Sequence, residues 1–167
     1  AGKSIPISYI IPESSLVVIT ASTSRSPLTS ISGLAASNFL AVQGITETTK
    51  MLKRNDSIIS ARGTVGEMAM IPFPMAFNQS CYGLRAKEDI VDAEYLYYLI
   101  KHNVVVLKKN THGSVFDTIT RDTFDGIEVD LPSLEEQKKV ASILRDYDDK
   151  IEVNNEINKN LQEQAQT

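Results

Sequence analysis

The C-terminal end of this sequence constrains its fold most, because it predicts one long helix. Ser133-Leu134-Glu135-Glu136 has the pattern of a capping box, in which the Ser133 hydroxyl accepts from the N–H of Glu136 and the Glu136 carboxylate accepts from the N–H of Ser133. From Ser133 to Thr167 there is no Pro or Gly, so nothing local ends the helix. Roughly 32 helical residues would extend about 48 Å, which exceeds the width of a small domain.

Residues spaced alternately three and four apart along this helix predict a coiled-coil stripe. Six of its eight positions are apolar and two are asparagines. This pairing stripe consists of Val140, Leu144, Tyr147, Ile151, Asn154, Asn158, Leu161 and Ala165. An isolated helix is marginal in water, so the stripe needs a partner surface. We expect the first two turns to pack on the chain's own body, and the part beyond about Asp148 to contact a second helix.

The preceding residues predict an α+β domain. Short strands are expected at 16–20, 38–42, 57–60, 67–71, 76–84 and 127–131. Asp92 is the predicted N-cap of a helix over 93–102, which is followed by a strand or buried turn at 104–107 and a loop at 108–114. Thr120 is expected to cap a single turn over 121–124. Because the elements lack βαβ regularity, we expect a mixed domain over 1–132 and a coiled-coil helix over 133–167.

Composition excludes several classes of protein. Apolar residues make up 42% and charged residues 23% of the chain, as in soluble globular proteins. Cys81 is the sole cysteine, which excludes a disulfide framework and a cysteine-cluster metal site. No apolar run reaches the roughly 18 to 20 residues of a membrane-spanning helix, and no charged-then-apolar leader opens the sequence. We therefore expect a cytoplasmic protein without membrane contact.

The formal net charge of −4 is unevenly distributed along the chain. Residues 1–130 hold 12 Lys+Arg against 13 Asp+Glu, whereas residues 131–167 hold 5 against 8. Within the first part, 50–62 and 101–121 each have a local net charge of +3. Such stretches usually form solvated faces, but on a near-neutral body they are also compatible with docking a polyanion.

The sequence contains no recognisable catalytic constellation. The stretch 63–67 has no Lys and Ser/Thr directly after its last glycine, as a phosphate-binding loop requires, and His102 and His112 lack metal-ligand spacing. There is no Gly-x-Ser-x-Gly elbow and no Asn/Asp-Pro-Pro-aromatic tetrad of an adenine methyltransferase. Glu128-Val129-Asp130 lacks the lysine of a restriction-nuclease core. We therefore expect no enzymatic activity, no metal and no cofactor.

The sequence resembles the specificity subunits of type I restriction–modification systems between Leu52 and Gln166. The matching stretches are LKRNDSIISARGTVG (52–66), AFNQSCYGL (76–84), EYLYYLI (94–100), GSVFDTITRDTFDGIEVDLPSLEEQKKVASIL (113–144) and DDKIEVNNEINKNLQEQAQ (148–166). The Gly-Thr-Val-Gly turn alone is a weak signal, whereas the ordered set is specific. Residues 1–51 match poorly, as expected where such domains differ in order to read different DNA.

The resemblance implies a target recognition domain followed by a conserved spacer helix. A complete family member has two such domains, each reading half of a bipartite site in double-stranded DNA. Two long antiparallel helices set the gap between the halves and dock two adenine-methylating modification subunits. Cleavage and translocation come from a separate restriction (motor) subunit, so the specificity subunit has no catalytic residues and binds no methyl donor.

This sequence has one domain and one helix, which leaves several alternatives open. It is a fragment, a truncated gene product or a natural half-subunit, and its helix pairs with another copy or with a missing second half. The alternative from a different class is a non-DNA adaptor whose helix dimerises a protein- or ligand-binding head. Net acidity slightly favours the adaptor.

The family motifs do not identify the residues that contact DNA, because these contacts lie in the variable parts. The candidates are therefore chosen by their charge and by their expected position in loops. The candidates are Ser24, Arg25, Lys50, Lys53, Arg54, Arg62, Lys108, Lys109, His112 and Arg121. Arginines suit bidentate reading of guanine, and lysines suit phosphate positioning. The motif residues expected to be structural are Gly63, Gly66, Asn78, Gln79 and Gly83. The DNA sequence that is read does not follow from charge.

Overall fold

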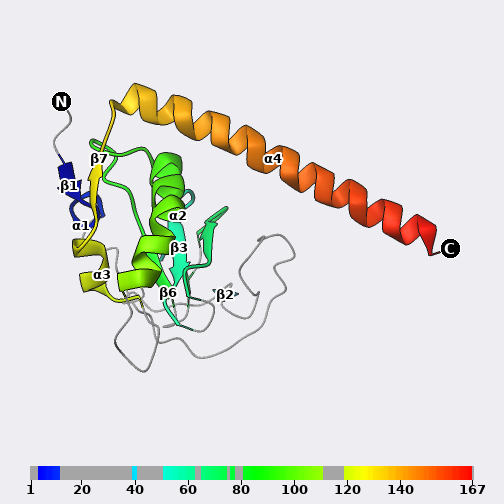
Figure 1. The fold of residues 1–167 in the computed structure, drawn as a ribbon, viewed down its shortest axis with the longest axis horizontal. Helices are drawn as coiled ribbons and strands as arrows, with labels where there is room; N and C mark the ends of the chain where they lie inside the picture. The colour runs from blue at the N-terminus through cyan, green and yellow to red at the C-terminus, as the bar shows by residue number, and fades with distance from the viewer. Residues whose placement is uncertain are drawn as a thin grey trace.

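The computed structural model describes residues 4–11, 39–40, 51–62, 65–74, 76–77, 81–110 and 119–166. In these parts of the chain, a small α+β head precedes one long helix that projects from it (Figure 1). The expected fold class is confirmed. The strand expected at 16–20 lies outside the described residues.

A three-stranded antiparallel sheet in the order β4-β3-β6 forms the centre of the head. The middle strand β3 (Ser57–Ser60) pairs with β4 (Met68–Met70) on one side and with β6 (Cys81–Leu84) on the other. All four residues of β3 are buried. In the turn between β3 and β4, Gly66 adopts a φ of 85° and donates its N–H to the Ser60 carbonyl, which confirms its structural role.

Two short strand pairs complete the β-structure. The pair β1 (Ser4–Pro6) and β7 (Glu128–Asp130) is antiparallel, and so is the pair β2 (Phe39–Leu40) and β5 (Ala76–Phe77). Of the strands expected around 38–42, 76–84 and 127–131, the structure shows strand residues at 39–40, 76–77, 81–84 and 128–130, and residues 38, 41–42 and 78–80 lie outside the described ranges. β1 and the single-turn helix α1 (Ile7–Ile10) that follows it have no counterpart in the sequence prediction.

Helix α2 (Ala93–Asn110) begins as predicted but extends further. The Asp92 carboxylate accepts from the N–H groups of Glu94 and Tyr95 at 3.1 and 3.0 Å, which confirms it as the N-cap. The strand or turn expected at 104–107 and the loop expected from 108 are wrong as far as Asn110. Val104 packs in the core one turn after Ile100, so tertiary packing overrides the β-preference of three consecutive valines.

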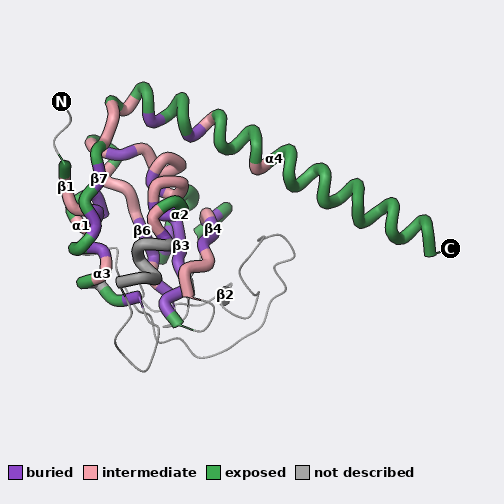
Figure 2. The backbone as a smooth tube through the Cα atoms, in the orientation of Figure 1, coloured by how far each residue is buried: buried purple, intermediate pink, exposed green. Residues whose placement is uncertain are grey.

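The core lies between the sheet, α1, α2 and α3 (Arg121–Asp125), as the purple segments of Figure 2 show. Phe124 of α3 is fully buried, and its ring meets the Tyr82 ring edge-on at 6.2 Å between centroids. Thr120 is the N-cap residue of this short helix, as expected, and its N–H donates to the Thr123 hydroxyl at 3.0 Å.

Helix α4 (Leu134–Ala165) has 32 residues and begins at the predicted capping box. The Ser133 N–H donates to the Glu136 carboxylate at 3.0 Å, and the Glu136 N–H donates to the Ser133 hydroxyl at 3.4 Å. Figure 2 shows α4 exposed along most of its length, and its buried residues are Gln137 and Ala141. In the part of the chain that the structure describes, no helix is long and apolar enough to cross a membrane.

Candidate nucleic-acid interface

Two of the basic candidates lie on a turn that precedes β3. Lys53 and Arg54 are exposed there, and Asn55 adopts the left-handed conformation with a φ of 70°. The Asp56 carboxylate accepts from the Lys53 N–H at 2.7 Å, while the Asp56 N–H donates to the Lys53 carbonyl at 3.1 Å. Asp56 therefore closes the turn that presents both cations.

Asp56 is itself held by an ion pair with Arg85. The Arg85 guanidinium donates Nη2–H to the carboxylate at 2.6 Å and Nε–H at 3.1 Å, and also donates to the Met51 carbonyl at 3.2 Å. The hydrogen bond to Asp56 and the charge of Asp56 raise the pKa of Arg85 despite its partial burial. The carboxylate is buried, whereas the guanidinium side chain keeps 35% of its surface exposed.

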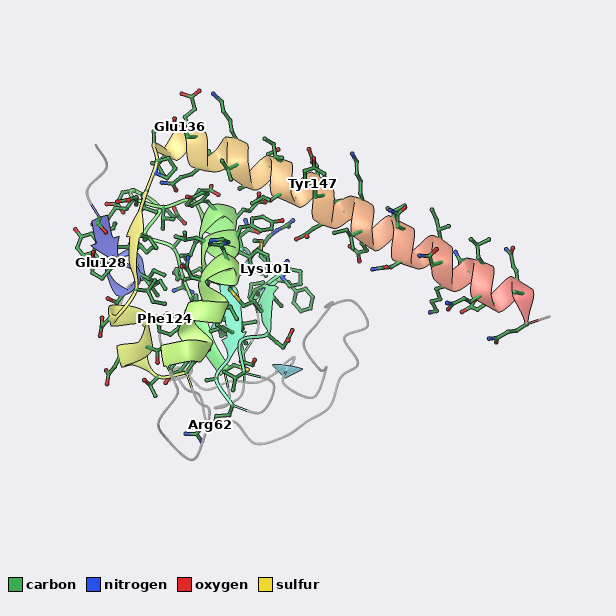
Figure 3. The ribbon with its side chains drawn as sticks, in the orientation of Figure 1. Arg62, Lys101, Phe124, Glu128, Glu136 and Tyr147 are labelled. Atoms are coloured by element: carbon green, nitrogen blue, oxygen red, sulfur yellow. The ribbon has the colours of Figure 1, made fainter. Side chains whose placement is uncertain are left out.

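Arg62 lies at the other end of β3. It is exposed, and Figure 3 shows it at the end of the head that is farthest from α4. The adjacent Ala61 carbonyl accepts from the Ile119 N–H at 3.2 Å, which brings the start of α3, where Arg121 lies, to the same end. The four residues of β3 separate this end from the 53–56 turn by about 13 Å. The structure therefore does not bring Arg62 together with Lys53 and Arg54.

The remaining candidates are placed only in part. Lys108 and Lys109 belong to the last turn of α2, and Arg121 is the first residue of α3, but their side chains are not described. Ser24, Arg25, Lys50 and His112 lie outside the described residues, as do Gly63, Asn78 and Gln79. In the described ranges, no group of His, Cys, Asp and Glu side chains is arranged to hold a metal ion.

One face of α4 contacts the head, and the sequence analysis missed its residues. This docked face consists of Gln137, Ala141, Arg145 and Asp148. Gln137 and Ala141 are 0% and 1% exposed. Arg145 donates to both oxygens of Glu94 at 2.6 and 2.8 Å. Their spacing of four, four and three residues is helical, but most of them are polar, so hydrophobic periodicity does not reveal the face.

Asp148 makes the last contact of the docked face. It accepts from the Tyr98 hydroxyl at 3.1 Å and from the Lys101 ammonium at 3.4 Å. Burial and the neighbouring Asp148 raise the pKa of Tyr98, so this hydroxyl remains a donor at physiological pH. After Asp148, every described residue of α4 is exposed. A groove of about 1050 Å³ opens where α4 diverges from α2 and β4.

The pairing stripe lies beside the docked face and is not covered by the head. Around a helix of 3.6 residues per turn, the two are roughly 100° apart. Tyr147, Ile151 and Leu161 are 61%, 56% and 56% exposed, and Figure 3 shows Tyr147 on the projecting part of α4. Ile143, Val153 and Ile157 add further exposed apolar surface. Because these side chains remain in solvent, the described residues of the head do not provide the partner surface that the stripe requires.

The described residues thus form a small α+β head whose last helix carries an exposed apolar face beyond the head. Residues 9–163 match the family of the type I restriction modification DNA specificity domain. The chain belongs to this family, as its motifs indicate.

Curated relatives agree with this membership. The type I restriction enzyme MjaIX specificity subunit of Methanocaldococcus jannaschii is 32% identical over 105 residues, which are 62% of this chain and 24% of the relative. The HindI specificity subunit of Haemophilus influenzae is 32% identical over 82 residues, or 47% of this chain and 18% of the relative. The chain thus spans about a quarter or less of the relatives it matches.

The likeness to solved structures extends to the fold. The S subunit from M. genitalium superposes with a TM-score of 0.63 over 91% of this chain and 40% of that one, at 16% identity. The HsdS subunit from Thermoanaerobacter tengcongensis gives 0.61 over 90% and 38%, also at 16% identity.

Proposed function

We propose that this chain is one DNA-reading half of a type I specificity subunit. Its head recognises one half of a bipartite site in double-stranded DNA, and its helix docks the adenine-methylating modification subunits and, through them, the restriction subunit. The observation that carries the proposal is the apolar stripe on a helix that continues past the head, in a chain of this family. The chain itself is non-catalytic and cytoplasmic.

In this proposal the exposed cations of the head contact DNA. Arg62 marks one contact region, at the end away from α4, and the turn carrying Lys53 and Arg54 marks a second. Two separated regions suit a surface that follows a duplex. In such an interface, phosphate contacts fix the position of the protein on the DNA and base contacts specify the sequence. The same end as Arg62 holds the start of α3 with Arg121.

DNA titrations test this role of the head. The chain, assembled with its modification subunits, is titrated with duplexes over a range of salt concentrations. If Lys53 contacts phosphate, Lys53→Glu should weaken binding to all sequences and flatten the salt dependence. If Arg62 reads a base, Arg62→Ala should reduce the binding free energy by about 1–3 kcal/mol and relax the preference at one base pair of the site. Lys138→Glu, an exposed change of equal charge on α4, is the control for Lys53→Glu. If every head variant binds DNA as tightly as the wild type, these residues do not contact DNA. If the head binds no DNA at any salt concentration, the non-DNA adaptor is favoured instead.

Light scattering tests the pairing of the helix. We propose that the stripe contacts a second spacer helix, from another copy or from a second half of the subunit. In the first case the chain should be a dimer at micromolar concentration and Ile151→Asp should make it monomeric. Asn160→Asp adds the same charge outside the stripe and should leave the mass unchanged. A strict monomer that Ile151→Asp does not alter contradicts self-pairing and leaves the second half as the partner.

A further inference from the structure

We propose that Gln137 is the positioning residue that sets the direction in which α4 leaves the head. The buried polar residues of the described chain include this glutamine, which is 0% exposed although it lies in the first turn of a largely exposed helix. Glutamine is rarely buried unless its amide is fully hydrogen-bonded.

Three hydrogen bonds join the Gln137 amide to backbone groups, using both of its N–H donors and one of the two lone pairs on its oxygen. Its Oε1 accepts from the Asp92 N–H at 2.9 Å. Its Nε2 donates to the Ile90 carbonyl at 3.2 Å and to the Pro132 carbonyl at 2.9 Å. The side chain therefore joins three segments: the loop before α2, the link from β7 to α4, and α4 itself.

The bond to Asp92 connects the starts of the two helices directly. Asp92 caps α2 with its carboxylate, while its own N–H is held by Gln137. The N-terminus of α4 is thus fixed relative to the N-terminus of α2. The planar amide with three partners constrains rotation as well as distance, because hydrogen bonds weaken steeply when they bend.

The two ion pairs of the docked face are less well placed to set this direction. Arg145 and Glu94 are 49% and 29% exposed, and Lys101 and Asp148 are 48% and 43% exposed. Exposed ion pairs hold their geometry weakly, since water and salt compete for both partners. Gln137 is shielded from water, so its geometry is maintained.

The consequence for DNA recognition rests on the proposed function. From Gln137 to Ala165, α4 runs about 42 Å. A tilt of roughly 10° at Gln137 therefore moves the far end by about 7 Å, which equals about two base-pair steps of DNA. The angle at Gln137 would thus help to determine how far apart two paired heads read their half-sites.

The test measures the distribution of distances between two spin labels, one on the head and one on α4, by pulsed electron paramagnetic resonance. Spin labels are placed at Asp125→Cys on α3 and Asn160→Cys on α4, both exposed positions. The labelled protein is diluted with unlabelled protein, so that only distances within one chain contribute. Cys81 is fully buried and burial raises its pKa to about 11, so it should take no label.

Gln137→Met, which keeps the size and removes the three bonds, should shift or broaden the distance distribution by several Å. Lys138→Met, the exposed neighbour, should leave it unchanged. A residue that only stabilises the fold would lower the melting temperature without changing this distribution in folded molecules. Should Gln137→Met not fold, Gln137→Glu decides: it can accept from Asp92 but cannot donate to the two carbonyls, and it should also broaden the distribution. A wild-type distribution in either folded variant overturns the proposal.

A second readout follows the spacing of the half-sites. The assembled complex is offered duplexes that differ only in the length of the gap between half-sites. The Gln137 variant should accept gaps changed by about two base pairs while the bases read stay the same. If the wild-type assembly binds no DNA, the proposed function fails, whereas the distance measurement still decides the role of Gln137.

Discussion

Replacing Asp56 should destabilise the head and weaken DNA binding together. Asp56→Ala removes the acceptor of the Lys53 N–H and the partner of the Arg85 guanidinium, which the carboxylate binds at 2.7 and 2.6 Å. The turn that carries Lys53 and Arg54 then loses its closing contact. Asp56→Asn keeps an acceptor of the same shape but removes the charge, so it should be the milder change.

The size of the effect follows from the burial of the two partners. Breaking a fully buried ion pair costs about 3–5 kcal/mol, because the remaining charge is left unpaired, whereas exposed pairs contribute about 0–1 kcal/mol. The Asp56 side chain is 7% exposed, but that of Arg85 is 35% exposed and can be solvated after the mutation. We therefore expect a loss of about 2–3 kcal/mol for Asp56→Ala, or roughly 4–12 °C in melting temperature for a chain of this length.

Thermal and urea unfolding followed by circular dichroism measure this loss. Arg85→Ala and the double variant complete a double-mutant cycle, which isolates the coupling between the two side chains. Asp125→Ala, a change at an exposed aspartate of α3, is the matched control. A loss below about 1 kcal/mol, or a coupling energy near zero, would refute the reasoning from burial.

Three further outcomes are expected. Phe124→Ala should cost about 3–5 kcal/mol in urea unfolding, because the ring is fully buried, and a loss near 1 kcal/mol would contradict this. Cys81 should react with a thiol reagent at pH 8 only after unfolding, since burial raises its pKa to about 11; rapid reaction of the native protein would show that the thiol is accessible. Ser133→Ala should cost about 1 kcal/mol near neutral pH. The hydrogen bonds from Ser133 lower the pKa of Glu136. Their contribution to stability is therefore present above the ordinary glutamate pKa and is lost as the pH falls through the lowered pKa of Glu136. In thermal melts, the difference in melting temperature between the wild type and Ser133→Ala should shrink below about pH 4.

Local signals in the sequence predicted the starts of the helices α2, α3 and α4 well. The caps at Asp92, Thr120 and Ser133 are recognised from short-range chemistry, and all three are confirmed. The second half of α2 was missed because its three valines favour strands locally, whereas burial of Val104 in the core of the head decides the outcome. Non-local packing of this kind cannot be read from a short window.

The candidate site was predicted less completely than the fold. Charge identified Lys53, Arg54 and Arg62 as exposed cations, but strand β3 places them at opposite ends of the sheet. The sequence does not predict the contacts of Gln137, since its partners Asp92 and Ile90 are more than forty positions away. A contact between an amide and distant backbone groups leaves no periodic signal in the sequence.

The acidic character of α4 has a consequence for the approach to DNA. Residues 131–167 have three more acidic than basic residues, and beyond Asp148 the helix is exposed. A duplex repels this segment within a Debye length, about 8 Å at physiological salt, while it attracts the cations of the head. Under the proposed function, encounters with DNA are therefore oriented head first, which keeps the apolar stripe of α4 away from the duplex.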